Sequence, residues 1–305
     1  NGQLLLQTAR ATAERGAPFL LLGLSLTYLL GDAVQGELKK LGKSLPVALG
    51  ARLTWALGAE GLALGLGTYG VAWTLAATLA TTLVPIVASI ACMLVVAIAG
   101  EELAKQTAAR LAEAVELESD RLGRFDRATA IWVVAVAASA VFTLSLADGA
   151  LYGSLAGPSE LVAACLFGGL LGTGGPSVVA LGALTEKGLS PGAALLGAAL
   201  SSALGAGVLV TLWRSFGPRV LTAALIWLVC LTCAVGIGIN QVAPIPSPLH
   251  FPAAVGRVAL WLLLGLIAVR AERVGVRRWL AGWFARASAH AAHHDHHHHG
   301  HAHDH

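Results

Sequence analysis

Charged side chains are scarce in this sequence. Of its 305 residues, 12% are Asp, Glu, Lys or Arg, whereas 56% are hydrophobic. This balance excludes an ordinary soluble domain, in which about a quarter of the residues are charged. The short alternating strands of a transmembrane β-barrel are missing as well. Because the charges sit in short islands between long apolar runs, we predict an all-α, polytopic integral membrane protein with about seven to eight spans.

Cysteines and catalytic motifs are also few. The four cysteines lie inside apolar runs, which excludes a secreted disulfide framework. No GxxxxGKS/T loop occurs, so direct drive by ATP is not expected. No Ser-His-Asp or HExxH pattern occurs either, so we expect neither an enzyme nor a required cofactor. A nucleic-acid partner is not expected.

The distribution of charge divides the chain into four parts. Residues 1–100 form an N-terminal membrane half, and residues 128–286 form a C-terminal membrane half. Residues 101–127 contain five basic and seven acidic residues with spaced leucines, which is typical of a cytosolic amphipathic linker helix. We expect residues 287–305 to form a disordered His-rich tail, because their composition cannot build a core.

The first half begins with a short span, Gly16–Gly31, and a polar loop, Asp32–Ser44. Leu45–Thr68 is apolar and Gly-rich, and it fits either a full span or a re-entrant pair of half-helices. Val71–Ile98 is a long span in which Pro85 predicts a kink.

The second half contains an apolar stretch that glycine and proline interrupt. Leu161–Thr185 carries no charge and is long enough to span a bilayer, but it includes six glycines and Pro176. We therefore expect a helix break near Thr173–Ser177. Such interrupted helices often carry the substrate site of a transporter, and the alternative is close helix packing through small residues. Ser190 has the position of an N-cap, with Pro191 in the first turn of the next span.

The two halves share one plan, which suggests a weak internal repeat of the kind that builds transporters. Each half has a plain span, a polar loop, a Gly-rich broken segment and a span with paired hydroxyls. The hydroxyl pairs are Thr81 and Thr82 in the first half, and Ser201 and Ser202 in the second.

Basic residues predict the orientation in a bacterial inner membrane. Arginines that follow the last span place the C-terminus in the cytoplasm, namely Arg270, Arg273, Arg277, Arg278 and Arg286. The linker at residues 101–127 belongs on the same side. Both assignments hold only if residues 161–185 enter and leave the membrane on one side, so topology independently favours a re-entrant segment.

The tail is the strongest chemical signal. Ten of the eleven histidines lie in it: His290, His293, His294, His296, His297, His298, His299, His301, His303 and His305. Imidazole is a suitable ligand for Zn, Cu, Ni and Co. An expression tag is the alternative, but tags are uniform His runs, whereas Ala, Asp and Gly interrupt this one. The tail indicates that the protein binds metal, but it does not show transport.

Several polar residues inside apolar runs are candidates for a substrate pathway. Cys230 and Cys233 are three residues apart, which puts both sulfurs on one helix face as a soft-metal pair. The alternative is that they are small apolar residues in a membrane helix. Glu60 is the best candidate for proton or cation coupling. The remaining pathway candidates are hydroxyl residues, namely Thr81, Thr82, Ser177, Ser201 and Ser202. The alternative is that these hydroxyls hydrogen-bond to their own helix or to a neighbouring one.

The segment Glu186–Leu195, EKGLSPGAAL, resembles a family of two-lobed bacterial permeases that includes organoarsenical efflux permeases and proteins assigned to copper or zinc efflux. Gly16–Leu30 is similar to that family's opening span. The resemblance implies a two-lobed membrane fold and an efflux activity. The family usually places Cys before the turn in its lobes. This chain has none in Thr173–Ser177 or in Leu57–Gly70, so it is a divergent member if it belongs there.

The sequence thus predicts an inner-membrane permease that exports a transition-metal cation by secondary transport, while the tail collects metal in the cytosol. The expected partners are the metal ion and the lipid bilayer, and the sequence leaves a homo-oligomer open. The alternative is a non-transporting membrane module that binds metal on its tail and acts as a sensor or assembly factor.

Overall fold

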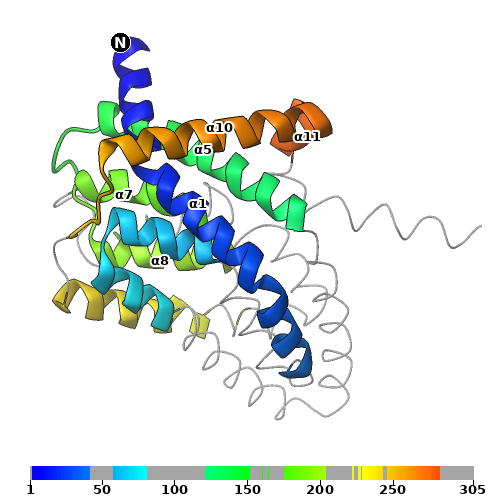
Figure 1. Cartoon of the computed structure of the whole chain (residues 1–305). Helices are drawn as coiled ribbons and strands as arrows, with labels where there is room; N and C mark the ends of the chain where they lie inside the picture. The colour runs from blue at the N-terminus through cyan, green and yellow to red at the C-terminus, as the bar shows by residue number, and fades with distance from the viewer. Residues whose placement is uncertain are drawn as a thin grey trace, which may run out of the picture.

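The computed structural model describes residues 2–41, 58–80, 121–151, 175–203, 229–242 and 246–281, with a few single positions between them. Every regular element in these residues is a helix, and none is a strand (Figure 1). The all-α prediction is therefore confirmed for the described part of the chain. Two of the helices are long and apolar enough to cross a membrane, at Phe125–Ser145 and Ala253–Val274.

Helix α1 (Gly2–Leu41) is a single helix of 40 residues. It includes the polar lead before Gly16 and most of the segment for which the sequence predicted a loop. The loop prediction was wrong as far as Leu41. Glu37, Leu38 and the lysines after them are good helix formers, and a charged run without proline does not end a helix by itself.

Three long helices pack together around small side chains. Helix α1 contacts both α5 (Arg121–Ser145) and α10 (Ala253–Val274). Ala13 and Ala17 of α1 are buried in one core with Trp132 of α5 and Leu263 of α10. Helix α5 begins inside the predicted linker, whose last seven residues are therefore part of this helix. A short helix, α11 (Val276–Ala281), follows α10 after Gly275.

The second half contains a helical hairpin. A 3₁₀ turn, η1 (Gly175–Ser177), leads into α7 (Val178–Glu186), and α8 (Pro191–Ala203) follows after a turn. The predicted break near residues 173–177 therefore coincides with η1, while the residues just before it lie outside the described part. At 1.5 Å per residue, α7 is about 14 Å long, less than half of a hydrocarbon core. The N-cap prediction is confirmed, because the amide of Ala193 donates to Ser190 Oγ at 3.2 Å.

The first half contains a matching hairpin. A helix at residues 58–68 ends in a turn at Tyr69 and Gly70, and the helix Val71–Ala80 follows. Gly70 has φ 93°, which a residue with a side chain rarely adopts. The same motif, Ala-Leu-Gly-x-x-Thr, occupies residues 63–68 here and residues 180–185 in α7. The repeated plan predicted from the sequence thus has a counterpart in two hairpins that share a local motif.

The two hairpins meet side by side with their turns at the same end. The hydroxyls of Tyr69 and Thr185 are 3.2 Å apart, and the indole Nε1 of Trp73 donates to the carbonyl of Pro191 at 3.0 Å. The ring of Tyr69 stacks on Trp73 with centroids 4.5 Å apart. Gly182 lets the two first helices approach, because a Cβ there would lie 2.2 Å from Thr68 Cγ2.

The end of α5 and the turn between α7 and α8 lie beside each other. Lys187 Nζ lies 2.5 Å from Asp148 Oδ1, and the amide of Leu151 donates to the Lys187 carbonyl at 3.0 Å. The amide of Ser190 donates to the Glu160 carboxylate at the same place. Asp148 and Leu151 therefore lie beside Lys187, and Glu160 lies beside Ser190.

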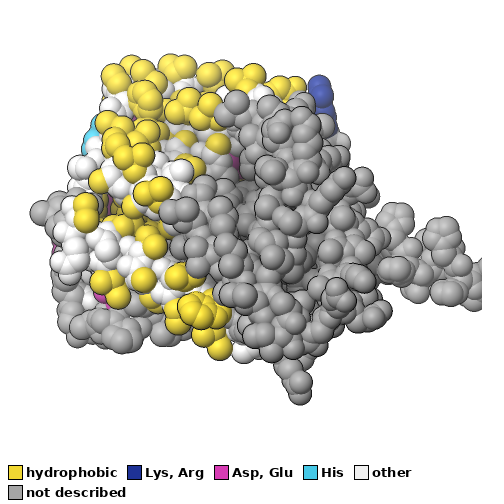
Figure 2. Space-filling view, turned by 90° about the horizontal axis from the view of Figure 1, so that it is seen from below, with side chains coloured by type: hydrophobic (Ala, Val, Ile, Leu, Met, Phe, Trp, Pro, Cys, Tyr) yellow, Lys and Arg dark blue, Asp and Glu magenta, His cyan; other side chains and the backbone are white. Residues whose placement is uncertain are grey.

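Much of the described surface is apolar. Figure 2 shows hydrophobic side chains over most of the described part of one face, with few charged groups among them. On α10, Trp261 is 71% exposed, and the side chains of Val258 and Leu262 are also more than half exposed. Large apolar side chains exposed in such numbers are unfavourable in water and favourable in lipid.

Candidate functional site

A pocket of about 370 Å³ lies where the two hairpins meet the other helices. Its walls come from the first half of α1, the end of α5, both first helices of the hairpins, and residues 248–250 before α10. Gly67 and Thr68 face it from one hairpin, and Gly182 and Ala183 face it from the other. The pocket is therefore built jointly by the two halves of the chain, at their repeated motif.

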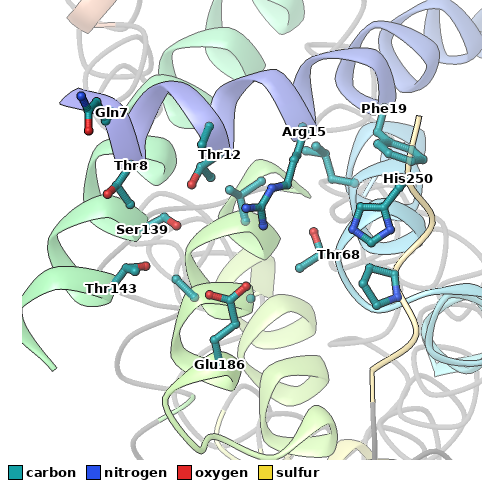
Figure 3. Close-up of a pocket in the computed structure, with 18 of the residues that line it drawn as sticks. Gln7, Thr8, Thr12, Arg15, Phe19, Thr68, Ser139, Thr143, Glu186 and His250 are labelled. Carbon is teal, nitrogen blue, oxygen red and sulfur yellow. The ribbon is translucent and has the colours of Figure 1, made fainter. Parts of the chain in front are cut away.

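Three ionisable side chains come together in this pocket. Figure 3 shows Arg15 reaching down from α1, Glu186 rising from the end of α7, and His250 at one side. Within the described residues, none of the three has a hydrogen bond or an ion pair. Each lies on a different segment, so the tertiary fold alone brings them together.

Hydroxyl groups line the rest of the polar wall. Thr8 and Thr12 lie on α1, and Ser139 and Thr143 lie on α5, facing them across the pocket (Figure 3). Thr8 donates its proton to the carbonyl of Leu4 at 2.9 Å, which leaves its oxygen free to accept. Residues four apart share a helix face, so each pair presents two hydroxyls to the same space.

A network of bonds fixes the turn that follows Glu186 in the second hairpin. Asn240 accepts from the amide of Gly192 at 2.7 Å and donates to Ser190 Oγ at 3.1 Å. The hydrogen bond and charge of Lys187 hold the pKa of Asp148 below its usual value. These contacts fasten both sides of the turn that follows α7.

The buried Glu60 lies outside this pocket. Its side chain is 7% exposed and accepts a hydrogen bond from Thr27 Oγ1 at 2.7 Å. Helix α1 passes unusually close here, since a Cβ on Gly23 would lie 2.3 Å from the Cα of Glu60. A buried carboxylate at a helix crossing remains a candidate for proton or cation coupling. Glu60 does not line the pocket described above.

The other predicted pathway residues that the structure describes are not gathered into one site. Ser177 is fully buried in η1, whereas Cys230 is exposed and Cys233 is half-buried on the helix Val229–Val242. Ser201 and Ser202 belong to α8, but their side chains lie outside the described set. Thr81, Thr82 and the ten tail histidines also lie outside the described residues.

No predicted site residue in the described part lines the pocket. Among the residues that the structure describes, no group of three or more His, Cys, Asp or Glu side chains could hold a metal ion. One signal in the sequence could have indicated the pocket. Arg15, Glu186 and His250 each lie within about two turns of the end of an apolar run, where charged groups of different spans can meet at one membrane face.

The opposite end of the helical core is fixed by an ion pair. Arg270 binds Asp126 with two contacts, Nε to Oδ1 at 2.9 Å and Nη2 to Oδ2 at 2.5 Å. The indole of Trp279 donates to Thr129 Oγ1 at 3.3 Å. Helix α10 separates this end from the pocket, and its 22 residues span about 33 Å. That distance is close to the thickness of a hydrocarbon core.

Comparisons of the chain with protein-family models, with curated proteins and with solved structures give no match.

Proposed function

We propose that the chain is a multi-pass inner-membrane permease that exports a transition-metal cation by secondary transport. The observation that carries the proposal is the pocket shared by two similar hairpins, one from each half of the chain. Secondary transporters place their sites between repeated halves, next to interrupted helices. In this proposal η1 and the short helix α7 are the returning arm of a re-entrant segment. The chain is then a divergent two-lobed permease.

The positions of the pocket and the tail support the proposed direction. His250 lies three residues before α10, and α11 follows α10 at its far end, ahead of the tail in the sequence. The pocket and α11 therefore lie on opposite sides of the bilayer if α10 crosses it. The arginines after α10 favour the cytoplasm for the tail. In this orientation the tail collects metal inside, and the pocket opens to the outside.

The cargo is proposed from ligand chemistry. Ten imidazoles in the tail suit Zn, Cu, Ni and Co. In the pocket, Glu186 and His250 are the side chains that suit these metals. The alternative, a metal-binding sensor or assembly module, is supported by the tail alone and assigns no role to the pocket.

A bacterial host stripped of its own metal exporters tests the proposal. The full chain is expressed beside a version stopped after Ala289, and the total cell content of Zn, Cu, Ni and Co is measured. A permease lowers the content of one metal in both strains, because the membrane core performs the export. Unchanged contents contradict the proposal, and a rise that disappears with the tail favours the metal-binding module.

A further inference from the structure

We propose that the pocket takes its metal as a complex with a small carboxylate ligand, and not as a bare ion. The inference rests on the proposed function and adds the chemical form of the substrate. It is drawn from the charges, the donors and the size of the pocket.

The charges in the pocket do not favour a bare dication. Arg15 and Glu186 carry opposite charges and line the same space, so their formal charges cancel. A divalent ion that leaves water needs negative charge around it to offset the loss of hydration. Arg15 opposes that requirement directly. A complex in which carboxylates have already neutralised the metal enters a neutral pocket without this cost.

The donors in the pocket are also too few for a bare ion. Zinc, for example, takes four ligands, mostly from nitrogen, sulfur and carboxylate oxygen. Glu186 and His250 supply at most two of them, and the other polar lining side chains are hydroxyls, one amide and Arg15. A chelating ligand that travels with the metal would supply the remaining positions.

Arg15 supplies a positively charged group that can bind the carboxylate of such a ligand. A guanidinium binds a carboxylate through two parallel hydrogen bonds. Arg15 has no partner within the described residues, and Figure 3 shows it directed into the pocket. Thr8 and Thr12 lie near it on α1, and their hydroxyls can bond a further oxygen of the ligand. These residues therefore recognise the organic part of the complex.

The volume of the pocket agrees with this form of the substrate. Six waters around a hydrated ion occupy about 180 Å³ at roughly 30 Å³ each. The pocket measures about 370 Å³, which is about twice that. It has room for a metal together with a ligand of several carbon atoms.

Equilibrium dialysis of the full chain in detergent tests the proposal, with radiolabelled iminodiacetate and zinc as probes. Iminodiacetate forms a neutral one-to-one complex with zinc and leaves coordination positions open. Three proteins are compared: wild type, Arg15→Gln and Arg10→Gln. Arg10 is the matched control, because it lies on the same helix but pairs with Glu14 at 2.8 Å, outside the pocket. Both arginines are exposed, so neither change disturbs the core. The tail contributes equally in all three.

We expect wild type and Arg10→Gln to bind zinc iminodiacetate equally, and one site per chain to weaken by about tenfold or more in Arg15→Gln. Two results would overturn the inference. One is equal binding by all three proteins. The other is a loss of zinc iminodiacetate binding in Arg10→Gln as large as that in Arg15→Gln, because Arg10 does not line the pocket. Dialysis measures binding without transport, so a failure of export in cells is distinguished from a failure of this ligand assignment.

Discussion

Replacing Trp73 with phenylalanine tests the contact between the two hairpins. The Trp73 side chain is 1% exposed, and its indole donates to the Pro191 carbonyl at the first residue of α8. Helix geometry also offers this carbonyl the amide of Leu195. Loss of the indole therefore removes the net value of one buried hydrogen bond, about 1 kcal/mol, and does not leave the carbonyl unpaired.

The smaller ring adds a packing loss. Phenylalanine lacks two carbons of the indole besides the nitrogen, which is worth about 1.5 kcal/mol at roughly 0.8 kcal/mol per buried carbon. The vacated space lies beside Gly65, where the six-membered ring of Trp73 now packs closely. The free energy of unfolding should therefore fall by about 2.5 kcal/mol, the sum of the two terms. At 2–4 °C per kcal/mol, the Tm should fall by roughly 5–10 °C.

The matched control is Trp261→Phe on α10. This tryptophan is 71% exposed and has no hydrogen bond in the described part, so the same substitution should change the Tm by less than about 2 °C. Thermal unfolding of both variants in one detergent, followed by near-UV circular dichroism, gives the comparison. Equal shifts for the two variants would refute the contact between the hairpins.

The remaining predictions concern other contacts of the same core. Gly192→Ala should cost about 1–3 kcal/mol, because its Cβ would lie 2.0 Å from the Gly236 carbonyl oxygen, whereas Gly238→Ala meets nothing within 4 Å and should cost nothing in the same melting assay. Arg270→Gln should cost about 3 kcal/mol in chemical unfolding, because it leaves a buried carboxylate without its ion pair; a loss below 1 kcal/mol would count against that pair. Asp148 has a lowered pKa, so its contribution is present above its usual value of 3.8 and disappears as the pH falls through the folded pKa. The Tm difference between wild type and Asp148→Asn should accordingly shrink to zero in acid, and a constant difference would contradict this.

Local features of the fold could be predicted because they depend on neighbouring residues. Proline and glycine act through the backbone, so Pro176 and the Ser190-Pro191 pair indicated η1 and the start of α8 at the correct places. The end of α1 was missed for a related reason. Lysine and glutamate suit a polar loop but also favour helix, and residues 31–41 contain glycine but no proline to end the helix.

The pocket could not be predicted because it depends on how distant segments pack. Arg15 and Glu186 are 171 residues apart in the sequence, by subtraction of their numbers, and nothing in either local pattern links them. Glu60 stood out because a lone charge in an apolar run is conspicuous, yet it pairs with Thr27 away from the pocket. The pocket charges were less conspicuous, since charges near span ends are common at membrane interfaces.

Flux of zinc through the reconstituted full chain tests the central claim most directly. The protein is placed in liposomes with a zinc-sensitive dye inside, and entry is followed with and without a proton gradient, with iminodiacetate present. The permease account predicts gradient-dependent flux above that of protein-free liposomes, and a loss of about tenfold or more in Glu186→Gln. Flux equal to that of protein-free liposomes under every gradient would contradict the account.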